Sequence, residues 1–112
     1  MKRILLTPYP GVVHVTRNLS DYQRVHKRLT GRADGSMHES MVGRMTPLER
    51  KGCARQYLVL ARNECGRGAS TLAHELSHVV FNLFELVGID PAACQGEPFC
   101  YMLGHLIDEA RK

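Results

Sequence analysis

Residues 71–78 have the sequence TLAHELSH, in which two histidines four positions apart enclose a glutamate. On an α-helix, residues i and i+4 lie on one face about 6 Å apart, so both imidazoles can reach the same metal ion. The glutamate between them then points toward the open side of that metal. The pattern therefore predicts a zinc site on a helix, with His74 and His78 as ligands and Glu75 beside them.

The residues around this stretch predict an amphipathic helix. Ser70 or Thr71 can cap its start, and Gly88 supplies a stop at its end. Apolar residues repeat at helical spacing through the segment: Leu72, Leu76, Val79 or Val80, Leu83 and Val87. This apolar stripe lies on a different face from the two histidines, which leaves both imidazoles available to a ligand.

The first thirty residues predict two strands and a helix. Ile4–Thr7 and Val12–Thr16 are short apolar runs separated by two prolines and a glycine, as expected for strands joined by a turn. Residues 21–30 carry an apolar stripe at helical spacing, with Ser20 as a potential N-cap and Gly31 at the end. We expect this helix to pack on the sheet.

Residues 31–50 contain several glycines and no sustained period, which predicts a long loop in which Ser40–Met45 can form a strand. Tyr57–Ala61 is a continuous apolar run and is the strongest strand prediction in the chain. Pro98 can open a last helix over residues 98–110. The inward side of that helix is formed by Phe99, Met102, Leu103, Leu106 and Ile107.

These elements predict an α+β fold in one domain over residues 1–112, with a sheet of three or four strands and about three helices. The charge is uneven, at +8 over residues 1–67 and −4 over residues 68–112. A basic half is compatible with nucleic acid or an acidic protein surface. Because no nucleic-acid motif accompanies it, we do not favour nucleic acid as a partner.

The start of the chain has only a short apolar run at residues 4–6, far shorter than a signal-peptide core or a membrane span. We therefore expect a cytoplasmic protein without membrane association. In that compartment the four cysteines, at positions 53, 65, 94 and 100, are expected to be reduced thiols.

A catalytic zinc needs a third protein ligand and an open position for water. Glu97 is the candidate, because the eighteen residues after His78 allow the chain to end one helix, reverse and begin another beside the metal. Cys94 and Cys100 flank Glu97 and are alternative ligands. Two thiolates added to two histidines would close the site, however, so we interpret both cysteines as buried thiols.

His74, His78 and Glu97 at this spacing resemble the gluzincins, which hold zinc with two histidines and a glutamate. More closely, residues 71–78, Gly88-Ile89 and 97–101 (EPFCY) resemble small phage and prophage proteins with a minimal zincin-like fold. The metzincins are a poorer match, because they need a glycine and a third histidine after the motif, where this chain has two phenylalanines, Phe81 and Phe84.

The resemblance implies a metallopeptidase with one zinc ion bound by His74, His78 and Glu97, and with Glu75 as the general base. It implies that the strand before the motif helix, Tyr57–Ala61, is the sheet edge on which an extended peptide or protein substrate lies. A phage-encoded protein of this kind would act in the bacterial host cytoplasm.

Stabilising a developing oxyanion needs a hydrogen-bond donor besides the metal. Tyr101 and His105, one and two turns beyond Glu97, are the candidates, and the alternative for Tyr101 is a place in the core. Asn82, one turn beyond His78, could orient a ligand or be a solvated polar residue.

Three functions fit the predicted site. The first is zinc-dependent peptide hydrolysis, and the second is hydrolysis of an amide or ester in a small molecule, since zinc-assisted attack by water does not specify a peptide. The third is a small binding module in which zinc only staples the fold and the chain contacts a host protein or nucleic acid.

Overall fold

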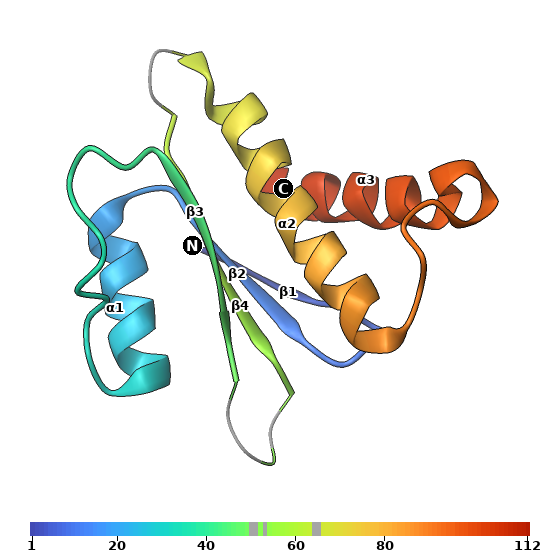
Figure 1. Cartoon of the computed structure of the whole chain (residues 1–112). Coiled ribbons are helices and arrows are strands. Elements are labelled where there is room, and N and C mark those ends of the chain that lie inside the picture. The colour runs from blue at the N-terminus through green and yellow to red at the C-terminus, as the bar shows by residue number, and fades with distance from the viewer. Residues whose placement is uncertain (50–51, 53, 64–65) are drawn as a thin grey trace.

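The computed structural model describes residues 1–49, 52, 54–63 and 66–112, and it confirms the predicted α+β class (Figure 1). Over these described residues, a four-stranded sheet is combined with three α-helices and a short 3₁₀ turn. In chain order the elements are β1 (Lys2–Leu5), β2 (Val12–Thr16), α1 (Leu19–Thr30), β3 (Gly43–Leu48), β4 (Gln56–Ala61), α2 (Gly68–Val87), η2 (Ala93–Gly96) and α3 (Glu97–Arg111).

The strand order in the sheet is β1-β2-β4-β3, with β2 and β4 parallel and the two outer pairs antiparallel. The expectation that Tyr57–Ala61 forms an edge is therefore wrong, because β4 lies between β2 and β3. All five of these residues are fully buried, as the continuous apolar run of a strand covered on both faces requires. The edge strand beside α2 is instead β3.

Helices cover both faces of the sheet (Figure 1). On one face, Val13, Val15 and Val59 join the apolar stripe of α2, and α3 packs against α2 beyond them. On the other face, Leu58 and Leu60 pack against Tyr22 and Val25 of α1. The two-sided core holds β2 and β4 rigidly, and α2 is therefore a firm support for the side chains on its outer face.

The starts of two helices differ from the sequence prediction. α1 begins at Leu19, because Asn18 rather than Ser20 is the N-cap and its Oδ1 accepts a hydrogen bond from the Asp21 amide at 2.8 Å. α2 begins at Gly68, whose amide donates to Asn63 Oδ1 at 2.8 Å. The N-cap position of α2 is Arg67, which makes no side-chain capping hydrogen bond, so neither Ser70 nor Thr71 caps this helix.

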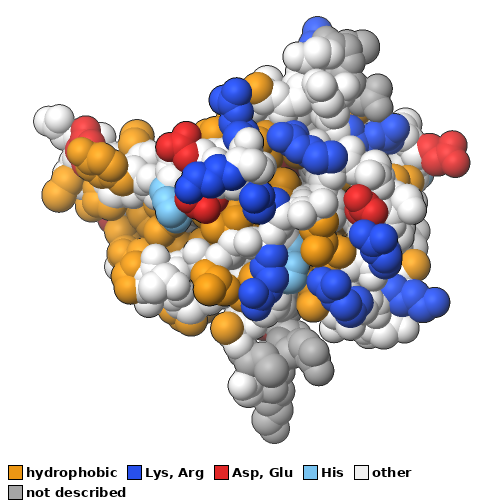
Figure 2. All heavy atoms as spheres, turned by 180° about the vertical axis from the view of Figure 1, so that it is seen from behind, with side chains coloured by type: hydrophobic (Ala, Val, Ile, Leu, Met, Phe, Trp, Pro, Cys, Tyr) orange, Lys and Arg blue, Asp and Glu red, His pale blue; other side chains and the backbone are white. Residues whose placement is uncertain are grey.

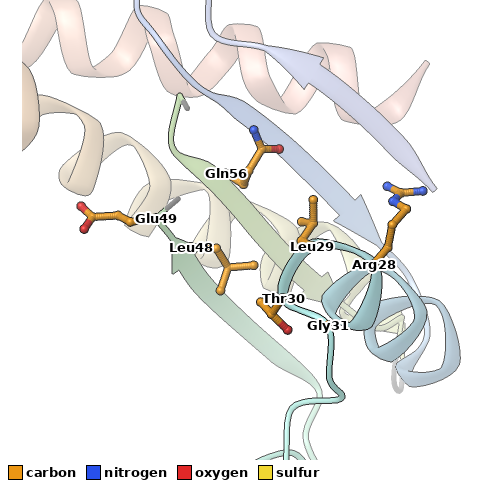
Figure 3. A pocket seen from close by; sticks show the side chains of 7 residues that line it. All are labelled: Arg28, Leu29, Thr30, Gly31, Leu48, Glu49 and Gln56. Carbon is orange, nitrogen blue, oxygen red and sulfur yellow. The ribbon is translucent and has the colours of Figure 1, made fainter. Parts of the chain in front are cut away.

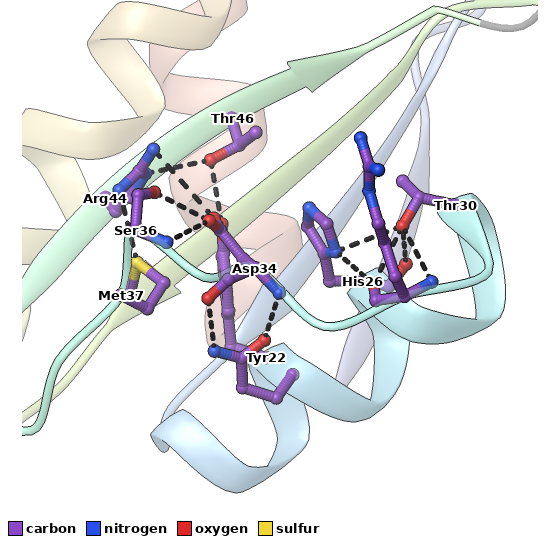
Figure 4. A network of polar contacts seen from close by, with 10 residues as sticks. Tyr22, His26, Thr30, Asp34, Ser36, Met37, Arg44 and Thr46 are labelled. Carbon is purple, nitrogen blue, oxygen red and sulfur yellow. Dashed lines mark hydrogen bonds and ion pairs between the residues drawn. The ribbon is translucent and has the colours of Figure 1, made fainter.

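The predicted loop over residues 31–50 contains a strand of six residues, because β3 occupies Gly43–Leu48. Its irregular part is tied to α1 and β3 by Asp34 (Figure 4). The carboxylate of Asp34 accepts hydrogen bonds from Tyr22 Oη at 2.8 Å and from the amide and hydroxyl of Ser36 at 3.0 and 2.6 Å. Arg44 Nη2 lies 3.8 Å away. These contacts fix the segment between α1 and the edge strand β3 against both elements.

Burial raises the pKa of the Asp34 carboxyl, but the hydrogen bonds from Ser36 and Tyr22 and the charge of Arg44 outweigh it and lower the pKa to about 2. Since the unfolded value is about 3.9, the ionised form stabilises the fold above about pH 4, and this contribution is lost as the pH falls to about 2.

We expect Asp34→Asn to lower the free energy of unfolding by about 1–2 kcal/mol at pH 6. The difference from the wild type should shrink at pH 3, as urea unfolding at the two pH values would measure. Asp108→Asn, at an exposed position on α3, is the control and should change little. An equal loss of unfolding free energy in both variants would contradict a specific stabilising role for the Asp34 carboxylate.

None of the described helices is long and apolar enough to cross a membrane. Seen from behind the view of Figure 1, the surface carries many Lys and Arg side chains with acidic ones among them (Figure 2). On α1 itself Arg24, Lys27 and Arg28 are exposed, and Arg24 pairs with Asp21 at 2.9 Å. The basic charge of the N-terminal half is thus a dispersed surface feature on this face.

Candidate metal centre

The two motif histidines lie together on the exposed face of α2. Their Nε2 atoms are 3.2 Å apart, and the rings meet edge to face with centroids 4.8 Å apart. Two nitrogen ligands of a tetrahedral zinc, each about 2.0–2.1 Å from the metal, are separated by about 3.3 Å. His74 and His78 therefore fit two positions of one zinc ion without moving the helix.

Glu75 lies on the inner side of the pair. It is 7% exposed, and its Oε1 is 3.9 Å from His74 Nε2. Burial raises the pKa of the Glu75 carboxyl, and the neighbouring His78 and His74 oppose that effect. A buried carboxyl with a raised pKa is a stronger base than an exposed one, and the Oε1 of Glu75 lies beside the Nε2 of His74.

The edge strand approaches Glu75 closely because its first residue is glycine. A Cβ atom at Gly43 would lie 2.8 Å from Thr71 Cγ2 and 2.9 Å from Glu75 Oε1, closer than carbon atoms come in real contacts. The backbone at the start of β3 is thus in direct contact with the general-base candidate. No local sequence pattern indicates a role for Gly43, because the strand and the helix that meet there are distant in the chain.

A cavity of about 350 Å³ lies where β3 meets the first turns of α2. Both His74 and Glu75 contribute to its wall, so it opens beside the proposed zinc position. Its other lining residues come from the start of β3 and the start of α2: Val42, Gly43, Arg67, Ser70 and Thr71.

Glu97 is not assembled with the histidine pair. Over the described residues, no group of three or more His, Cys, Asp or Glu side chains is placed to hold a metal ion. Glu97 is exposed and is the first residue of α3. Two positions further on, the Phe99 ring packs on Phe81 of α2 at 4.6 Å between centroids. α3 thus begins beside the helical turn that follows His78.

Tyr101 and His105 lie on α3, at a cavity that is separate from the histidine pair. Both line a cavity of about 360 Å³ with Tyr9, Phe84 and other residues, and neither lines the cavity that contains His74 and Glu75. Tyr101 is 75% exposed, so it does not occupy the core either. The structure gives these two side chains no contact with the histidine pair.

The other polar candidates have structural partners. Asn82 Oδ1 accepts hydrogen bonds from Arg55 Nη1 at 2.5 Å and Tyr57 Oη at 3.0 Å, so it braces α2 on β4 instead of orienting a histidine. His14 and His26 are buried against Gln56 and against the Arg32 carbonyl, respectively, whereas His38 is exposed in the loop.

Cys94 and Cys100 are free thiols, and both are exposed, so their interpretation as buried residues is wrong. They lie on either side of Glu97 at the start of α3, where all three residues are exposed to solvent. Cys53 and Cys65 lie outside the described residues.

Another cavity, of about 480 Å³, lies at the end of α1, where Arg28 and Leu29 face Leu48 and Gln56 (Figure 3). Glu49 also lines it and forms an ion pair with Arg55. None of its lining residues belongs to the histidine pair or to α2, so it is separate from the candidate metal centre.

Comparison with protein-family models, with curated proteins and with solved structures gives no match for this chain.

Proposed function

We propose that this chain is a zinc-dependent peptide hydrolase whose site is formed by the outer face of α2 and the edge strand β3. The observation that supports the proposal most strongly is the 3.2 Å separation of His74 Nε2 and His78 Nε2 beside the buried Glu75. Two exposed imidazoles at ligand spacing with an adjacent buried base match the requirements of metal-assisted hydrolysis.

In this proposal His74 and His78 would hold the ion through Nε2. Glu97, which the structure does not place with them, would complete the ligand set after the start of α3 moves toward the pair. Zinc, when bound, acts as a Lewis acid and lowers the pKa of water from about 16 to about 7. Glu75 accepts the proton of the attacking water and delivers it to the nitrogen of the leaving amine. Its burial favours both steps, since its pKa is raised toward the pH at which the proton must move.

The edge position of β3 supports a peptide as the substrate. An edge strand has backbone donors and acceptors on one side that an extended peptide can pair with. β3 pairs with β4 on one side only, and its start contacts Thr71 and Glu75. A peptide added along β3 would bring its carbonyl groups past the general base, whereas a small amide has no need for such an edge.

The proposal is tested by incubating the zinc-loaded protein with a random octapeptide library and identifying cleaved products by mass spectrometry. Cleavage that stops on treatment with a chelator and returns on adding zinc is the expected result. A stoichiometric zinc without cleavage of any peptide would instead favour the binding module.

Glu97→Ala is expected to weaken zinc binding by more than about tenfold, because the ion would lose its third protein ligand. Binding is measured by competition with a chromophoric chelator. Asp108→Ala, which removes an exposed carboxylate from the same helix, should leave zinc affinity unchanged. Wild-type affinity in Glu97→Ala would exclude Glu97 as a ligand and leave the histidine pair with only water or substrate.

A further inference from the structure

The cavity beside His74 and Glu75 contains one cationic side chain, that of Arg67. Arg67 precedes the first turn of α2, its carbonyl accepts a hydrogen bond from the Thr71 amide at 2.9 Å, and its side chain is exposed. Among the described residues it has no ion-pair partner. A guanidinium at a cavity wall without a carboxylate partner is available to an anionic ligand.

Other features of the cavity are consistent with an anionic ligand. The first turn of α2 contains no acidic residue, and the Ser70 hydroxyl that lines the cavity forms no hydrogen bond with a described residue. The only carboxylate in the wall is that of Glu75, about two helical turns beyond Arg67 along α2. The chain as a whole carries a net charge of +4, which attracts acidic molecules.

The size and position of the cavity also suit a side chain of a bound peptide. Its volume of about 350 Å³ exceeds that of a single side chain, and it is at the lower end of the range for small-ligand pockets. Because the start of β3 forms one wall, a peptide paired along β3 would direct alternate side chains toward α2.

We propose that this cavity is a specificity pocket that receives an aspartate or glutamate side chain of the substrate, with Arg67 binding its carboxylate. This inference rests on the proposed function, and it adds selectivity to backbone pairing that by itself would discriminate little between sequences. The acidic residue lies on the side of the scissile bond that faces the start of α2.

The test uses fluorescein-labelled octapeptides of Ala and Gly that carry Glu, Gln or Lys at one central position. Their affinity is measured by fluorescence anisotropy on the zinc-loaded Glu75→Gln chain, which binds peptide without consuming it. We expect the Glu peptide to bind about tenfold more tightly than the Gln peptide, the size of one charge-assisted hydrogen-bonded pair.

Arg67→Ala should reduce this Glu-to-Gln ratio to about one, and Arg67→Glu should make the Lys peptide the tightest of the three. A role for Arg67 in structure alone would not reverse the preference. Arg111→Ala is the matched control, because Arg111 lines a neighbouring cavity at the same end of α2 but not this one. It removes the same charge and should preserve the ratio.

Equal affinity of the Glu75→Gln chain, with Arg67 intact, for the Glu and Gln peptides would overturn the inference, as would a loss of the ratio in Arg111→Ala equal to that in Arg67→Ala. The binding ratio is independent of cleavage. If no peptide is hydrolysed but the ratio depends on Arg67, the proposed enzymatic function fails and the acidic-peptide pocket stands.

Discussion

Replacing Glu75 with glutamine is expected to lower the kcat of peptide hydrolysis by about 10²–10⁴, while zinc remains bound at wild-type stoichiometry. Glutamine has the shape of glutamate but cannot accept the proton of the attacking water. Both histidines stay in place, so the ligands of the ion are unaffected. The fold should not suffer, because a neutral amide is less costly to bury at this 7% exposed position than a carboxylate.

Glu85→Gln provides the control for charge, since Glu85 is exposed on the same helix ten residues further on. Its kcat should equal that of the wild type. Initial rates on the best peptide from the library, together with zinc analysis of each variant, make the comparison. Full activity of Glu75→Gln would show that another group takes the proton and would refute the proposed mechanism.

The second large effect is expected from the histidines. His74→Ala and His78→Ala should each weaken zinc binding by at least about 100-fold, because each removes one of two nitrogen ligands placed 3.2 Å apart. Hydrolysis should be lost at the same time. Zinc content after dialysis against a weak chelator, measured by plasma mass spectrometry, gives the stoichiometry.

His105→Ala is the matched control, because His105 is an exposed histidine on α3 that lines a different cavity. This variant should retain one zinc ion per chain and its activity. If both motif variants retained zinc while His105→Ala lost it, the metal centre would have to be moved to α3.

Strands and helices with a regular run of apolar residues in the sequence were predicted well. Val12–Thr16 matches β2 in both bounds, because an alternating apolar run after Gly11 has one interpretation. β3 was predicted only in part, since its second half contains Pro47, which an interior strand would exclude. An edge strand tolerates proline, and recognising β3 as an edge requires the sheet order, which no local pattern encodes.

The same limit applies to the site. The spacing of His74 and His78 is a property of one helix, so the sequence predicted their approach correctly. The position of Glu97 depends on the turn before α3, where Cys94 and Gln95 adopt positive φ angles of 53° and 59°. Neither residue type signals such a conformation, so the path of the chain into α3 could not be derived from sequence.

Gly43 and Arg67 illustrate what only the tertiary structure provides. Gly43 allows the edge strand to approach Glu75 closely, and Arg67 places a cation at the adjacent cavity. The two residues are distant in sequence and meet because β3 lies beside α2. The histidine pair can be found from a motif, whereas the cavity beside it arises from the packing of β3 on α2.

The central claim, a zinc ion held by His74 and His78, is tested most directly by X-ray diffraction from zinc-soaked crystals on both sides of the zinc absorption edge. The account predicts one strong anomalous peak about 2.0–2.1 Å from Nε2 of both histidines, with Glu75 beside it but not bound to the ion. A peak at Cys94 or Cys100, or no peak between the two imidazoles, would contradict it.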